Sequence, residues 1–145
     1  MLVNREAQPA HAPPPGAFGG LGIYDVSNPG RPREITFWRS GGAGAHRFTL
    51  EGRYAYTSPE MDGYVGNIVM ILDLKDPAHP QEVGRWWMPG QWTAGGEKPA
   101  WKGDMHKCHH PLRHGNRLYT SYWHGGLVIL DIEDMAKPRH VSGLD

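Results

Sequence analysis

The chain has 145 residues, of which 15 are basic and 15 acidic, so its formal net charge at pH 7 is zero. This balance argues against a nucleic-acid partner, which needs a basic surface, and against electrostatic docking on an acidic membrane. The sequence shows no apolar run of about 18 residues that would span a bilayer and no signal peptide, and its single cysteine excludes an internal disulfide.

The 20 glycines and 13 prolines are typical of many short strands joined by tight turns. Aromatic residues and runs of Val, Ile and Leu favour such a fold over disorder. No window longer than about ten residues keeps a helical period free of Gly or Pro. The composition therefore predicts an all-β fold.

One sequence pattern occurs three times, at residues 22–35, 70–83 and 128–141. Each copy has an apolar run that ends in aspartate and is followed by a turn with prolines. The aspartates lie 48 and 58 residues apart. A second pattern aligns residues 46–58 on residues 109–121 without a gap. Four-stranded units that recur at roughly this spacing are typical of β-propeller blades.

In chain order, residues 1–38 hold only part of the first repeat. Its apolar run begins at Leu21, and only residues 2–4 are available to form the strand before it. The proline-rich segment 5–20 separates the two. We therefore expect half a blade over residues 1–38.

Residues 46–88 form a complete repeat, with expected strands at 47–50, 54–58, 68–74 and 82–88. Gly52 lies in the tight turn between the first two strands. The prolines of the turn at 75–80 end the third strand, since proline cannot pair within a central strand. The continuous apolar run of the third strand predicts that both of its faces are covered.

A long loop is expected at residues 89–108, followed by a second complete blade at 109–145. The total is about two and a half blades, whereas propellers usually close with about four to eight. Strand edges left bare at the two ends recruit other strands. We therefore expect the chain to self-associate, or to dock on the missing remainder of the propeller, and not to be a stable monomer by itself.

The three apolar runs resemble the LVIVD repeat; they read LGIYD at 21–25, VMILD at 69–73 and LVILD at 127–131. The resemblance extends over most of residues 21–145 and implies a β-propeller of antiparallel four-stranded blades. LVIVD propellers are similar in plan to the selenium-binding-protein family, which includes methanethiol oxidases. In those proteins histidines near the propeller axis are implicated in metal binding and oxidation. Only His46, with His109 or His110, stands at a position that corresponds.

The long loops are expected on one face of the propeller, because loops alternate between the two ends of an up-and-down sheet. They cover residues 5–20, 39–45, 59–66 and 89–108. Long loops on one rim of a rigid scaffold are the usual place for binding and chemistry. We expect a functional site on this rim.

Histidines are the strongest candidates for that site. His46 and His109 occupy one repeat position at the start of the innermost strand, so both imidazoles are expected beside the axis, with His106 or His110 as a third ligand. In an extended strand His109 and His110 point to opposite faces, so only one of them enters a given site. Imidazoles suit Cu, Fe or Zn, and an open coordination position suits catalysis. A purely structural role is the alternative.

Further residues of the same rim could line a pocket for a small-molecule substrate. Trp86 and Trp87 continue a strand and are expected to pack between blades. Each pocket candidate also has an ordinary interpretation as core packing or as a solvated side chain. Two hypotheses remain: a metal-dependent enzyme, such as an oxidoreductase, or a non-catalytic interaction scaffold. The pocket candidates are His124, Trp92, Trp101, Glu97, Asp104 and Cys108.

Overall fold

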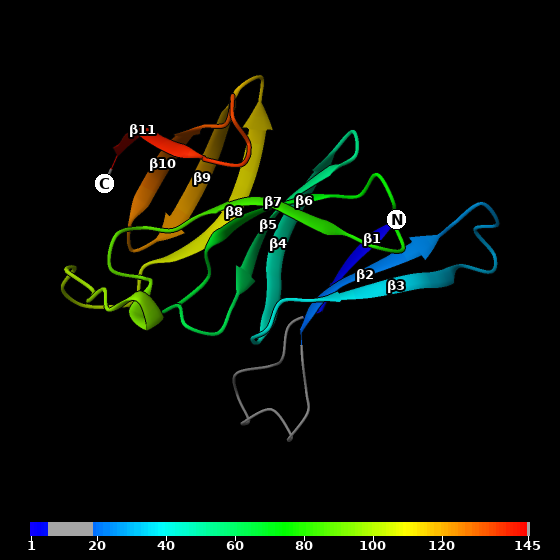
Figure 1. Cartoon of the computed structure of the whole chain (residues 1–145), viewed down its shortest axis with the longest axis horizontal. Coiled ribbons are helices and arrows are strands. Elements are labelled where there is room, and N and C mark those ends of the chain that lie inside the picture. Colours follow the sequence, from blue (N-terminus) through cyan, green and yellow to red (C-terminus); the bar gives the residue numbers. More distant parts are fainter. Residues whose placement is uncertain (6–18, 145) are drawn as a thin grey trace.

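The structure, a computed structural model, describes residues 1–5 and 19–144 and contains three antiparallel sheets packed side by side (Figure 1). This confirms the expected all-β fold with blade-like sheets. The only helical segment in the described part of the chain is the 3₁₀ turn η1 (Thr93–Gly95), and no helix there could cross a membrane. The strands are β1 (Leu2–Arg5), β2 (Gly20–Asp25), β3 (Arg33–Arg39), β4 (Gly44–Glu51), β5 (Tyr54–Glu60), β6 (Val69–Asp73), β7 (Gln81–Trp86), β8 (Lys107–His114), β9 (Arg117–Trp123), β10 (Gly126–Asp131) and β11 (Arg139–Leu144).

Each sheet is a simple meander in which consecutive strands pair. The first sheet has the order β1-β2-β3, the second β4-β5-β6-β7 and the third β8-β9-β10-β11. The first strands of the two complete sheets begin earlier than the sequence predicts. Gly44 and Ala45 of β4 pair with Glu60 and Pro59, and Lys107 and Cys108 of β8 pair with Trp123 and Tyr122. Most of the expected proline-rich loop at 5–20 lies outside the described residues.

The core lies between the sheets, in two clusters. Val69 and Ile71 of β6 join the cluster between the second and third sheets, whereas Met70 and Leu72 join the cluster between the first and second sheets. All four side chains are fully buried. Strand β6 is therefore covered on both faces, as its continuous apolar run predicts.

The aspartate that ends each apolar run makes the same contacts in all three sheets. One carboxylate oxygen of Asp25, Asp73 and Asp131 accepts a hydrogen bond from the backbone N–H two residues later. The other oxygen pairs with an arginine. Such a turn needs a short acidic side chain, which explains why aspartate recurs at this position. The arginine partners are Arg33 for Asp25, Arg53 for Asp73, and Arg117 and Arg139 for Asp131.

These contacts are expected to make the stability of the fold depend on acid pH. The Ser27 N–H and the Arg33 guanidinium lower the pKa of Asp25 from 3.8 to about 2. The Glu133 N–H and Arg117 lower the pKa of Asp131 in the same direction. A carboxyl with a lowered pKa in the folded state stabilises the fold above its unfolded pKa and loses that effect as pH falls through the folded pKa.

We therefore expect the unfolding midpoint in urea to fall between about pH 4 and pH 2. An Asp131→Asn variant should be less stable at pH 7 and should lose less of its stability over this acid range. Asp62→Asn, at an exposed loop position, is the control and should follow the parent protein. The same acid dependence in Asp131→Asn and in the parent would contradict the assignment.

Candidate metal-binding histidine pair

The inner strands of the two complete sheets each contain a β-bulge at the same repeat position. In β8, Cys108 pairs with Tyr122 and His110 with Ser121, so His109 is an extra residue. In β4, one extra residue likewise lies between the pairs Ala45–Pro59 and Phe48–Thr57, where His46 and Arg47 stand opposite Ser58. Bulges re-aim side chains and are common next to functional sites.

Ser58 connects the two bulges. Its hydroxyl accepts a hydrogen bond from the Arg47 N–H at 3.0 Å, and it lies 2.8 Å from the carbonyl oxygen of His109, to which it donates. The side chain is fully buried. A single hydroxyl group thus holds β4 of the second sheet against β8 of the third, immediately beside the two histidines.

The imidazole rings of His46 and His109 lie against each other. Their centroids are 5.0 Å apart, and the ring planes are inclined at 57°. The Trp123 ring lies next to His109, with the two ring centroids 5.4 Å apart and the ring planes at 85°. Burial lowers the pKa of His109, and the neighbouring His46 and Arg47 lower it further. The His109 ring is therefore neutral at pH 7.

The other two proposed ligands have different surroundings. Nε2 of His110 lies 3.1 Å from the hydroxyl oxygen of Thr49. His106 stacks on the indole of Trp101 at 4.7 Å, and its Nδ1 lies 3.1 Å from Sδ of Met88. Among residues 1–5 and 19–144, no group of three or more His, Cys, Asp or Glu side chains is arranged to hold a metal ion. The structure thus brings the rings of His46 and His109 together, with the His110 ring next to that of His109, whereas His106 stacks on Trp101.

The bulge also alters the expected alternation of side chains. A regular strand would place the rings of His109 and His110 on opposite faces. Because His109 is the extra residue of the bulge, the regular alternation is interrupted at this point, and the two ring centroids are 6.4 Å apart. Sequence periodicity carries no sign of this irregularity.

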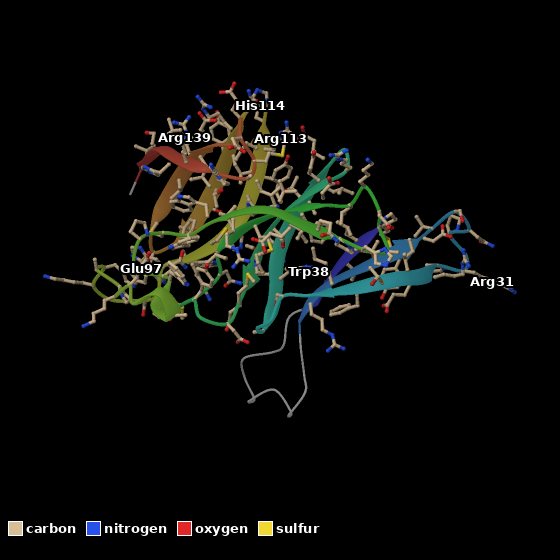
Figure 2. The ribbon with its side chains drawn as sticks, in the orientation of Figure 1. Arg31, Trp38, Glu97, Arg113, His114 and Arg139 are labelled. Carbon is tan, nitrogen blue, oxygen red and sulfur yellow. The ribbon has the colours of Figure 1, made fainter. Side chains whose placement is uncertain are left out.

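Glu97 organises the long loop. Its carboxylate accepts hydrogen bonds from the indole N–H of Trp87 at 3.1 Å and from the backbone N–H groups of Gly90 and Trp92. These bonds, that of Trp87 above all, lower the pKa of Glu97. Figure 2 shows Glu97 at the loop end of the sheets, away from Arg113 and His114 at the other end of β8.

The remaining pocket candidates lie apart. Asp104 is exposed and 3.8 Å from Nε2 of His124. Cys108 is fully buried in the cluster between the second and third sheets, and this burial raises the pKa of its thiol. The Cys108 thiol is therefore protonated at neutral pH and packs as a small apolar group. Trp92 is 40% exposed.

Trp86 packs between blades as expected, whereas Trp87 does not. Trp86 lies between the second and third sheets, with its ring 5.8 Å from that of Tyr122. Trp87 follows the end of β7 and instead packs among loop side chains, against Tyr64 and Trp92. The strand ends one residue too early to carry Trp87 into the interface.

Gln91 has a structural role that the sequence does not indicate. Its side chain is fully buried in the long loop. Its amide nitrogen donates to the carbonyl oxygens of Val65 at 2.8 Å and Asn67 at 3.1 Å, and its amide oxygen accepts from the Met88 N–H at 2.8 Å. One side chain thus joins the loop after β5 to the loop after β7, on the same rim of the molecule.

An apolar cavity of 260 Å³ lies between the outer strands of the second and third sheets. His140 stacks on Trp86 at this cavity, with 6.2 Å between ring centroids. The histidine pair is on the inner strands β4 and β8, so the cavity and the pair are at opposite edges of the sheets. The cavity is lined by Trp86, Met88, Pro89, Val128 and His140.

Comparison with protein families finds a match to the LVIVD repeat. The model of the LVIVD repeat matches residues 17–37, 44–87 and 114–143, which together make up well over half of the chain. No curated protein matches the chain. The three matched segments contain the three apolar runs of β2, β6 and β10 with their terminal aspartates.

Proposed function

Because the chain belongs to the LVIVD repeat family, we propose that its propeller-type scaffold carries a transition-metal site at His46 and His109. The observation that carries the proposal is the 5.0 Å separation of the two rings. With metal–nitrogen distances of about 2.0–2.1 Å and a tetrahedral angle, two imidazoles on one ion have centroids roughly 5 Å apart. The pair thus has the spacing of two ligands of one ion.

Two further observations indicate that the positions of the two histidines are fixed by the surrounding structure. Both histidines occupy bulges, and the buried hydroxyl of Ser58 fixes the two bulges relative to each other. Imidazole is a good ligand for Zn, Cu and Fe. Two protein ligands leave coordination positions for water, for a substrate, or for groups outside the described residues. With copper or iron, such open positions suit oxidation of a small molecule, which is the enzymatic form of the proposal.

A non-catalytic interaction scaffold is the second candidate function. It is favoured by the fact that residues 1–5 and 19–144 contain no three-ligand group of His, Cys, Asp or Glu. Its expected property is that the folded chain binds no transition metal with appreciable affinity. One experiment therefore separates the two candidates.

The test is metal binding by the untagged full chain, measured by elemental analysis and by calorimetric titration with Zn²⁺ and Cu²⁺. Loss of both ligands in a His46→Ala, His109→Ala double variant is expected to weaken binding by more than about 100-fold, since changes outside the first ligand shell already cost about 10- to 100-fold. The matched control replaces by alanine two exposed histidines, His79 in the turn after β6 and His114 at the end of β8, and should bind as the parent does. Unchanged metal content in the double variant would overturn the proposal.

A further inference from the structure

The interface between successive sheets is repeated position by position along the chain. We call the side of a sheet that packs on the next sheet in the chain its forward face. Strand pairing places Leu2 opposite Ile23, Tyr56 opposite Ile71 and Tyr119 opposite Ile129. These pairs stand at one repeat position of the forward face in the first, second and third sheets.

The forward face is covered in the first two sheets and open in the third. Tyr56, Val69 and Ile71 of the second sheet are fully buried under the third sheet. At the corresponding positions of the third sheet, Tyr119 is 36% exposed and Leu127 and Ile129 are partly exposed. Leu144, which pairs with Leu127 as Trp86 pairs with Val69, is 73% exposed. The third sheet therefore presents the apolar surface that the second sheet buries.

The cover of the second sheet makes two polar contacts in addition to apolar packing. Nη1 of Arg113 on β8 donates to Oη of Tyr56 at 2.7 Å, and the guanidinium lies over the tyrosine ring. Ser58 donates to the bulge carbonyl of His109. Tyr119 and Ser121 repeat this tyrosine and this serine on the third sheet. The open face thus carries the same tyrosine and serine that the third sheet contacts on the second sheet.

At the two interfaces, the residue on the next sheet that contacts the repeat position of Tyr56 differs together with the residue at that position. At the first interface, Leu50 of β4 stands at the repeat position of Arg113, and it lines the same crevice of 360 Å³ as Leu2. A leucine therefore faces a leucine, whereas an arginine faces a tyrosine hydroxyl. A strand that covers Tyr119 is accordingly expected to carry a hydrogen-bond donor at this position.

We propose that the forward face of the third sheet, formed by Tyr119, Ser121, Leu127, Ile129 and Leu144, binds a further four-stranded LVIVD-type blade. The innermost strand of that blade carries an arginine at the position of Arg113. It also has a bulge whose carbonyl oxygen accepts a hydrogen bond from the Ser121 hydroxyl. The described first sheet of a second copy does not present such a strand, because no strand lies inside β1 among residues 1–5 and 19–144. The proposal is independent of metal binding by the histidine pair.

The experiment adds a copy of the third sheet, which in the structure already packs on the forward face of the second sheet. A second copy of residues 103–144 is joined to the C-terminus of the full chain, with the tyrosine equivalent to Tyr119 replaced by phenylalanine in the added copy. Tyrosine nitration is followed by mass spectrometry in the full chain and in the extended chain. The rate at Tyr119 is expected to fall at least about tenfold when the added blade covers it, while Tyr56 is protected in both proteins.

A matched variant places leucine at the position of Arg113 in the added blade. It keeps the apolar cover but lacks the donor, so protection of Tyr119 is expected to be weaker than with arginine. Equal reactivity of Tyr119 in the full and extended chains would overturn the proposal. An unfolded added blade would count equally against it, since a single repeat is stabilised largely by its neighbour. Protection of Tyr119 in the unextended chain that rises with concentration would identify a second copy as the occupant and also overturn it.

Discussion

Replacement of Tyr56 by alanine is expected to lower the free energy of unfolding by about 3–5 kcal/mol, the usual cost of truncating a large aromatic side chain in a core. The side chain is fully buried between the second and third sheets and belongs to their shared cluster. Tyr119→Ala alters the same residue type at the same repeat position, but on an open face. It is expected to change the free energy by less than about 1 kcal/mol.

Urea denaturation of the two variants measures this difference directly. Tyr56→Phe separates the packing of the ring from the hydrogen bond with Arg113, and its expected cost is about 1.5–3 kcal/mol, because the bond involves a charged donor. Similar destabilisation by Tyr56→Ala and Tyr119→Ala would mean that the third sheet does not cover Tyr56 in solution.

Replacement of Gln91 by alanine is expected to cost about 2–4 kcal/mol, because it removes a buried group that satisfies several backbone atoms at once. The Met88 N–H and the Val65 carbonyl oxygen lose this partner, whereas the Asn67 carbonyl oxygen keeps its hydrogen bond from the Cys108 N–H. The long loop should then loosen around Gln91, while the backbone hydrogen bonds from the Val65 N–H to the Gln91 carbonyl oxygen and from the Ala94 N–H to the Gly63 carbonyl oxygen still join it to the loop after β5. The consequence for His106 is direct, as its carbonyl oxygen also accepts from Gln91, at 3.2 Å.

Hydrogen exchange of residues 87–106, together with thermal unfolding, measures this effect. Gln81→Ala is the matched control, because Gln81 is exposed and its amide donates to the carbonyl oxygen of His79. Its expected change is within about 0.5 kcal/mol. If Gln91→Ala were as mild as this control, water would have to replace the lost hydrogen bonds, and the loop would not depend on the glutamine.

The sequence predicts the strands well because the repeat provides several examples of one pattern. The apolar run of β6 predicts a strand covered on both faces, and the structure divides its side chains between the two core clusters. The alignment of His46 with His109 likewise predicts one structural position, which the two bulges share. Repetition thus carries both the fold and the juxtaposition of this pair.

What the sequence could not supply lies in the irregular parts. No pattern predicts the bulges, since an extra residue leaves the apolar spacing of the neighbouring strands unchanged. The stacking of His106 on Trp101 and the hydrogen bonds of Gln91 depend on the path of a long loop that occurs once and has no second copy for comparison. The selenium-binding-protein likeness rests on histidine positions alone and stays a prediction.

The position of Ser58 has a consequence for how the histidine pair comes apart. His46 belongs to the second sheet and His109 to the third, and the serine hydroxyl bridges the two sheets beside them. In repeat structures, neighbouring units open at their mutual interfaces while each unit keeps its own strand pairing. The two imidazole rings therefore stay in contact only while the interface between the second and third sheets is closed. Any binding event that tightens or separates the second and third sheets acts on the pair without touching either ring.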